Sequence, residues 1–465
     1  MITGDFRIKE AVLAFSFAVL LLGSRVPFLD AGYGVNVDAW RVARAARNIV
    51  ATGSYEASRS PGYPVHEIAS SGLWRGGPFA LNGGSAVLSV AAVMAFWMFA
   101  ARMGIRDRIL ASVALALTPI FYISSVTSKD YVWALAFVLF GLLAVLNGRA
   151  LLGGLFLGLA AGCRLTSLAM LVPAAMILIG ACERKQRLSS VTVMALSCGA
   201  MSALVFWPVL AKYGLVFITF YETHARPDWR TVLERGTIEV WGTIGLVGLL
   251  VAVIGFVLVR VRPGRWQPAA VSRIQNPCVA PALAVIIVVY AVAYFRLPDQ
   301  AGYLLPVIPA TLMLAALYGP RLCFQIFCLT LIVAPFVEIS TVGLAAGPIF
   351  ADRRERLQTI ESIRNFVQFS RSLPGRSMIL VGGWEPQIDV LFPETSGNIR
   401  YVYLLSDERL KAAINDGFTV YYLPAIRAFN ASVYGIDVAK FGARDLRAVY
   451  EERAWEREKD KDRRE

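Results

Sequence analysis

The chain has 465 residues, of which 57% are hydrophobic and 17% are charged, and its mean hydropathy is +0.57. Average soluble domains contain about 45–50% apolar and about 25% charged residues, and a single soluble core stops growing beyond roughly 250–300 residues. Because the apolar residues also come in long blocks, the composition excludes a soluble globular protein and predicts an α-helical polytopic membrane protein.

The formal net charge is +13, and most of it lies in the first 350 residues, which hold 27 basic and 15 acidic residues. A basic excess in short segments between apolar blocks usually sets the orientation of a membrane protein. The sequence has no basic stripe with interleaved aromatic residues, so nucleic acid is not a predicted partner. The six cysteines lie in or beside apolar blocks without a CxxC or Cys/His pattern, and we interpret them as small buried side chains.

About eleven transmembrane helices are predicted in chain order. The first, 11–27, follows Arg7 and Lys9 and is interpreted as a retained span with a cytoplasmic N-terminus, because no small-residue cleavage site follows it. The other apolar blocks lie near 79–101, 109–126, 131–147, 150–163, 165–182, 189–211, 238–259, 276–295, 302–319 and 321–345. The block 150–163 is shorter than the roughly 20 residues of a perpendicular helix, so it is predicted to be tilted or half-buried.

Eleven spans from a cytoplasmic start place the long first loop and the C-terminal region on the extracytoplasmic side. Short, arginine-rich loops at 102–108, 183–187 and 260–273 then face the cytoplasm, as orientation by Lys and Arg bias requires. The distribution of basic residues therefore supports this predicted topology.

The first extracytoplasmic loop, 28–78, carries two candidate elements. From Asp38 onward, apolar residues alternate with arginines at helical spacing, which predicts an amphipathic helix on the membrane surface with Asp38 in its first turn. A helix N-cap is the structural alternative for Asp38. Residues 59–64 (RSPGYP) predict a rigid turn that presents Arg59 and Tyr63. The turn either only connects two elements or binds an anionic headgroup.

Further polar residues gather in the later extracytoplasmic loops. Lys129 and Asp130 begin the span 131–147, where interfacial anchoring is the structural alternative. Arg164 lies between two apolar stretches and needs an anionic partner, either a structural ion pair or a lipid phosphate. The candidates in the last two loops are His224, Arg226 and Tyr303. This one-sided concentration favours an enzyme at the outer interface, since a transporter would place ionisable residues near the bilayer midplane.

The composition changes near residue 351. Residues 352–371 have helical periodicity, and the stretches SMILVGG, RYVYLL and FTVYYLP are typical of short strands separated by helices such as 406–415. We therefore predict three regions: a transmembrane catalytic domain over 1–345, a small extracytoplasmic α/β domain over 346–449, and a charged tail over 450–465.

In the order of these motifs, the chain resembles the GT-C class of membrane glycosyltransferases. Within that class it is similar to the bacterial branch related to protein O-mannosyltransferases and the lipid A aminoarabinose transferase. The resemblance covers roughly residues 1–345. It rests on the acidic residue of the first loop, the RSPGYP turn, the Lys-Asp-Tyr start of the span 131–147, the GxxxGxR-like stretch 158–164 and the YLLPxxP stretch 303–309.

The resemblance implies an inverting transferase of the bacterial inner membrane that moves a sugar from a polyprenyl-phosphate carrier to a glycan, lipid or protein acceptor. It implies that Asp38 is the general base and that Asp130 occupies a second acidic position, beside the acceptor or the sugar. The predicted ligands of the donor phosphate and substrate are Arg59, Tyr63, Lys129, Arg164, His224, Arg226 and Tyr303. The leaving phosphate needs charge stabilisation more than a proton, whereas an acceptor hydroxyl needs a carboxylate base.

No cofactor is predicted. Many relatives carry paired acids in the first loop, but the stretch Asn36-Val37-Asp38-Ala39 offers one carboxylate, and a divalent metal prefers several oxygen ligands. Three other functions stay open on the sequence: a ligase or polymerase that uses a polyprenyl-diphosphate glycan, a transporter or flippase for a lipid-linked sugar, and a scaffold that presents the C-terminal domain.

Overall fold

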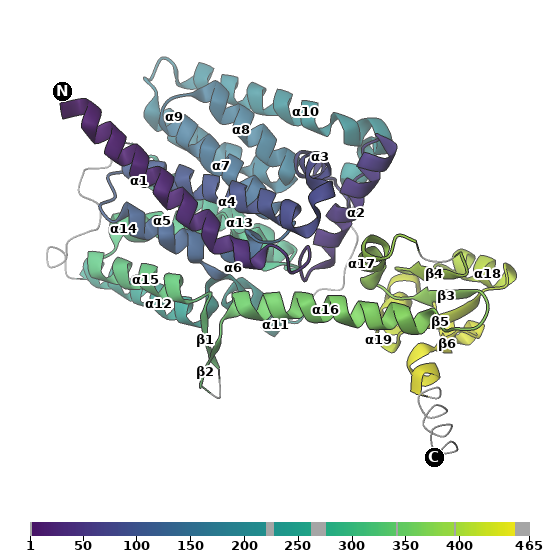
Figure 1. Ribbon diagram of the computed structural model, residues 1–465. Coiled ribbons are helices and arrows are strands. Elements are labelled where there is room, and N and C mark those ends of the chain that lie inside the picture. The colour runs from purple at the N-terminus through teal and green to yellow at the C-terminus, as the bar shows by residue number, and fades with distance from the viewer. Residues whose placement is uncertain (1, 220–226, 262–275, 341–342, 395–396, 452–465) are drawn as a thin grey trace. The chain divides into compact units, whose positions relative to one another are not determined.

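The computed structural model describes residues 2–219, 227–261, 276–340, 343–394 and 397–451. The chain divides into two compact units, Met1–Arg356 and Leu357–Glu465. The first unit is mostly helical, and the second contains a small sheet flanked by helices (Figure 1). Of the predicted tail 450–465, residues 452–465 lie outside the described residues.

Within the described residues, six helical segments are long and apolar enough to cross a membrane. They overlap α1 (Ile2–Arg25), α4 (Gly77–Arg102), α10 (Arg187–Thr219), α12 (Ile238–Val261), α13 (Val279–Arg296) and α14 (Val307–Tyr318). Shorter apolar helices are α5 (Arg108–Leu117), α7 (Tyr131–Leu146), α8 (Ala150–Cys163), η3 (Leu165–Met170) with α9 (Leu171–Ala181), and α15 (Arg321–Val333). Each predicted apolar block therefore contains an apolar helix, while the number of membrane crossings stays a prediction.

Two of the predicted blocks are not continuous helices. The block 109–126 divides at Thr118, which is extended (ψ 131°) before α6 (Pro119–Ser124), because a residue that precedes proline is driven out of the helical region. The prediction of one span over 321–345 is wrong beyond the end of α15. Pro335 lacks the N–H that a continuing helix needs, and β1 (Val337–Ser340) and β2 (Gly343–Ala346) then pair as an antiparallel hairpin.

Small residues let α8 pack closely along α10 (Figure 1). A Cβ atom on Gly154 would lie 1.9 Å from the Ser197 hydroxyl oxygen, and one on Gly158 would lie 2.6 Å from Met201 Cβ. The two glycines are about one helical turn apart, a spacing that lets helices in membranes approach each other. The small-residue stretch before Arg164 therefore serves helix packing, and α8 ends where Arg164 becomes extended (φ −153°, ψ 115°).

The second unit is built on a parallel four-stranded sheet with the strand order β4–β3–β5–β6. Its strands are β3 (Ser377–Leu380), β4 (Ile399–Val402), β5 (Thr419–Tyr422) and β6 (Arg444–Asp445), and its helices include α17 (Trp384–Leu391), α18 (Asp407–Asn415) and α19 (Pro424–Tyr434). Ile379 packs with Ile363 of α16 (Pro348–Ser370), whereas Leu380 packs with Leu410 of α18. Apolar clusters thus cover both faces of the sheet, as a parallel sheet requires, and the predicted strands are present.

Candidate active site

Asp38 lies in the first turn of α2 (Val37–Thr52), as the sequence predicts. The N-cap of this helix is Asn36, whose side-chain oxygen accepts a hydrogen bond from the Asp38 backbone N–H at 2.8 Å. The alternative that Asp38 itself caps the helix is therefore wrong. The helix is anchored by its buried face, on which Trp40 donates a hydrogen bond to the Gly34 carbonyl oxygen, so the Asp38 carboxylate is left for other partners.

The Asp38 carboxylate lies among cations and is 13% exposed. Its oxygens are 3.3 Å from Arg59 Nε and 3.5 Å from Arg41 Nη1, and one of them accepts a hydrogen bond from Gln300 Nε2 at 3.0 Å. Burial alone would raise the pKa of Asp38. The Arg59, Arg41 and Lys129 charges and the Gln300 hydrogen bond outweigh burial, so this pKa lies below its ordinary value. Asp38 is thus a carboxylate at neutral pH.

Arg59 joins the two candidate acids. It reaches Asp38 through Nε and donates through Nη2 to the Asp130 carboxylate at 2.9 Å. Its guanidinium lies 4.0 Å from the centre of the Tyr63 ring, and the Gly62 N–H closes the intervening turn on the Arg59 carbonyl oxygen at 2.8 Å. The RSPGYP segment therefore forms the predicted turn, which ends where α3 (Pro64–Leu73) begins.

Asp130 is held by a second arginine from a distant part of the chain. Arg164 Nη1 donates to it at 2.6 Å, and the Asp130 side chain is only 1% exposed. Burial would raise the pKa of Asp130, but the charges of Arg164 and Arg59 hold this pKa below its ordinary value. No three His, Cys, Asp or Glu side chains in the described ranges come together so as to hold a metal. Asp130 faces arginines instead.

Aromatic rings enclose the Arg164 guanidinium. Its central carbon lies 4.1 Å from the centre of the Tyr131 ring, 4.7 Å from that of Tyr303 and 5.9 Å from that of Tyr63. Cation–π contacts of this kind attract a guanidinium group and restrain its position. The structure thus brings together seven of the nine predicted site residues. His224 and Arg226 lie outside the described residues.

Gln300 connects Asp38 to Lys129 and was not among the predicted site residues. Its Nε2 group donates to Asp38, while its Oε1 atom accepts from Lys129 Nζ at 3.2 Å and from the Tyr131 hydroxyl at 2.7 Å. The residue directly precedes η4 (Ala301–Leu304), which carries Tyr303. Its place in the stretch LPDQAGYLLP, beside a predicted site residue, is the one signal that could have identified it.

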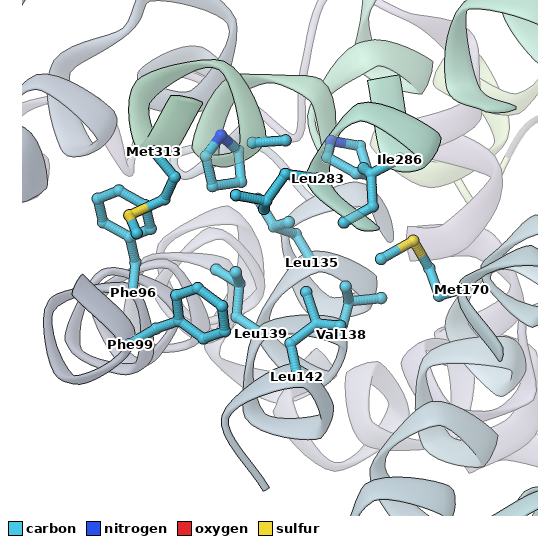
Figure 2. Close-up of a pocket in the computed structure, with 13 residues that line it drawn as sticks. Phe96, Phe99, Leu135, Val138, Leu139, Leu142, Met170, Leu283, Ile286 and Met313 are labelled. Atoms are coloured by element: carbon cyan, nitrogen blue, oxygen red, sulfur yellow. The ribbon is translucent and has the colours of Figure 1, made fainter. Parts of the chain in front are cut away.

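A small apolar pocket lies among the helices of the first unit (Figure 2). Leu135, Val138, Leu139 and Leu142 line it from the face of α7 that follows Tyr131. Side chains from α4, η3, α13 and α14 complete it: Phe96, Phe99, Met170, Leu283, Ile286, Pro306, Pro309, Ala310 and Met313. All thirteen side chains are apolar, and they leave only a small space between them, as in a packed core.

Comparisons with known proteins concern the fold alone. No family model matches this chain, and no curated protein matches its sequence. Among solved structures, the chain is similar to the crystal structure of ArnT from Cupriavidus metallidurans in the apo state. The similarity covers 95% of this chain and 90% of that chain, with 13% sequence identity and a TM-score of 0.43.

Proposed function

We propose that this protein is an inverting glycosyltransferase that moves a sugar from a polyprenyl-phosphate carrier to an acceptor on the extracytoplasmic side of the membrane, with Asp38 as the general base. One observation carries the proposal. A carboxylate of lowered pKa lies in a connected group of cations and hydrogen-bond donors. Such a site offers a base and a phosphate-binding surface.

In the proposed reaction, the Asp38 carboxylate accepts the proton of an acceptor hydroxyl while the hydroxyl oxygen attacks the anomeric carbon of the sugar. The new C–O bond forms on the face opposite the carrier phosphate, and the bond from the anomeric carbon to the phosphate oxygen breaks. The phosphate leaves with the bonding electron pair, so the configuration inverts. Fixed cations aimed at the leaving phosphate stabilise its growing negative charge, which is commonly the largest contribution to this kind of catalysis.

The balance of charge supports a monophosphate carrier. Four cations, Arg41, Arg59, Lys129 and Arg164, lie around the two carboxylates Asp38 and Asp130. Together they have a formal excess of two positive charges, and a released polyprenyl monophosphate carries at most two negative charges. In this arrangement Arg59 and Arg164 bind phosphate oxygens, and Asp130 orients the two guanidinium groups.

The carrier lipid is the most direct test. Mass spectrometry of lipids that copurify with the protein is expected to detect a polyprenyl phosphate, free or linked to a sugar. A polyprenyl-diphosphate glycan in its place would support the competing ligase or polymerase. A preparation with bulk phospholipids alone would contradict the proposal.

The proposed orientation can be checked by labelling single cysteines with a membrane-impermeant maleimide in a cysteine-free background. Ser54, Lys185 and Arg400 are exposed and suit this replacement. We expect labelling from outside the cell at positions 54 and 400 and protection at position 185, because the arginine-rich loop 183–187 is proposed to face the cytoplasm. Labelling at 185 with protection at 54 would reverse the orientation.

Gln300→Leu is expected to shift the pH dependence of turnover. The Gln300 hydrogen bond lowers the pKa of Asp38, so its loss raises that pKa and moves the acid limb of the pH–rate profile to higher pH. Gln387→Leu is the control, since Gln387 is a buried glutamine of the second unit. An acid limb that stays in place in Gln300→Leu would show that this residue does not act on the base.

A further inference from the structure

Glu67 is a buried carboxylate that the proposed reaction does not use directly. It lies in the first turn of α3 and is 0% exposed. Burying a carboxylate is costly unless hydrogen bonds compensate for the lost water. Here each carboxylate oxygen accepts two. Oε1 accepts from the Ser58 N–H at 2.7 Å and from the Ser58 hydroxyl at 2.5 Å, and Oε2 accepts from the Tyr63 N–H at 3.0 Å and from the Tyr55 hydroxyl.

The two backbone donors lie on either side of Arg59. Ser58 directly precedes it, and Tyr63 ends the turn that Arg59 begins. A backbone N–H can only donate, so each of these positions needs an acceptor, and a carboxylate supplies one on both sides. An amide in the same place would turn its NH2 group toward one pair of donors and lose the hydrogen bonds on that side.

The rest of the turn is fixed against α10, which leaves Glu67 to set the two ends. The Ser60 hydroxyl donates to the Phe217 carbonyl oxygen at 2.5 Å. Gly62 has φ +90°, and a Cβ atom there would lie 3.1 Å from a Val209 methyl carbon and 3.2 Å from the Tyr55 hydroxyl oxygen. The middle of the turn is therefore pressed against its neighbours, whereas Ser58 and Tyr63 are tied to one carboxylate.

We propose that Glu67 is a positioning residue for Arg59: by holding Ser58 and Tyr63, it sets the guanidinium between Asp38 and Asp130, where the carrier phosphate would bind. The inference rests on the proposed function for the identity of that anion. The clamp, which is the set of hydrogen bonds from Ser58 and Tyr63 to the Glu67 carboxylate, rests on the geometry alone. In this role Glu67 neither binds substrate nor contacts the proposed general base.

Loosening the clamp has a consequence at Asp38. Four groups from different elements face that carboxylate: Arg59 from the turn, Arg41 from α2, Lys129 from the segment before α7, and Gln300 from the segment before η4. When Arg59 moves away, the other three stay. The pKa of Asp38 then rises toward its ordinary value, and the acid limb of the pH–rate profile moves upward.

The test compares Glu67→Gln with Asp107→Asn. The second variant is a matched carboxylate-to-amide change away from the site, in which Asp107 gives up one of the two oxygens that accept 2.8 Å hydrogen bonds from Arg321. The probe is a polyprenyl phosphate added to the purified protein in nanodiscs. We expect Glu67→Gln to weaken probe binding about tenfold. In an Arg59→Gln background, the same change is expected to cause no further loss of probe binding. Asp107→Asn should bind the probe like the parent.

Amide hydrogen exchange tests the clamp without reference to function. Exchange at Ser58 and Tyr63 is expected to accelerate in Glu67→Gln and to stay unchanged in Asp107→Asn. Unchanged exchange, or Glu67→Gln that binds the probe like the parent, would overturn the inference. A parent that binds no polyprenyl phosphate would overturn the proposed function, while the exchange rates still decide the clamp. If Glu67→Gln does not fold, Tyr55→Phe removes one donor, and a measurable loss of binding is expected from it as well.

Discussion

Replacing Asp38 with asparagine is expected to lower turnover by about 10²- to 10⁴-fold, the usual contribution of a positioned general base, and to leave the affinity for a polyprenyl phosphate nearly unchanged. Asparagine keeps the size of the side chain and one oxygen for Arg59, but it cannot accept a proton at neutral pH. In the parent, the acid limb that Asp38 governs is expected below the ordinary titration range of an aspartate, because the nearby cations and the Gln300 hydrogen bond lower the pKa of Asp38. That limb should disappear in the variant.

The control for this variant is Asp228→Asn. Asp228 is the N-cap of α11 (Trp229–Gly236) and accepts a hydrogen bond from the Thr231 N–H at 2.9 Å; asparagine caps a helix about as well. The control should retain parental turnover. If Asp38→Asn also turns over at the parental rate, the base is another group or the protein is not this enzyme. A transporter or scaffold would tolerate the change.

Arg164→Lys is expected to behave like a loss of the side chain and not like a conservative change. The guanidinium bonds Asp130 and packs against three tyrosine rings at once, and the proposed reaction adds a phosphate oxygen to its partners. An ammonium group has no planar fork to reach an aspartate and a phosphate together. A charged hydrogen bond is worth about 1.5–3 kcal/mol, so affinity for a polyprenyl phosphate should fall about ten- to a hundredfold.

Arg321→Lys is the matched control, because Arg321 also bonds an aspartate, Asp107, through Nε and Nη2. We expect both variants to lower the melting temperature and Arg164→Lys alone to lose affinity. If Arg164→Lys and Arg164→Ala bind the carrier like the parent, or if both only unfold, Arg164 is a structural residue and its proposed contact with phosphate is wrong.

The charged residues of the candidate site can be picked out in the sequence, because charge at the end of an apolar block is conspicuous. Asp38, Arg59, Asp130 and Arg164 each stand out against apolar neighbours, and the structure places them in one chain of ion pairs. What the sequence could not show is that Asp130 bonds two arginines. That pairing depends on folding segments 71 and 34 positions away onto it.

The neutral and buried members of the site were missed for a related reason. Gln300 acts on Asp38 across 262 positions, and an uncharged amide in a loop gives no periodic signal. Glu67 follows a histidine in a short helix, where an acid usually faces water, and its burial depends on donors supplied by another segment. In the fold, the break at Thr118 could have been predicted from Pro119. The β1–β2 hairpin after α15 could not, because its residues are mostly apolar and composition alone predicts that the helix continues.

Asp130 provides a permanent anion between two arginines, 2.9 Å from one and 2.6 Å from the other. In the proposed reaction, this anion would remain as a counter-ion after the spent carrier departs. Without it, Arg164 would lose the carboxylate that it bonds and Arg59 would keep only Asp38, so the site would retain a phosphate dianion more tightly. We therefore expect Asp130 to hasten departure of the used carrier and to keep free inorganic phosphate from occupying the site, so that carrier lipid returns to the membrane after each cycle.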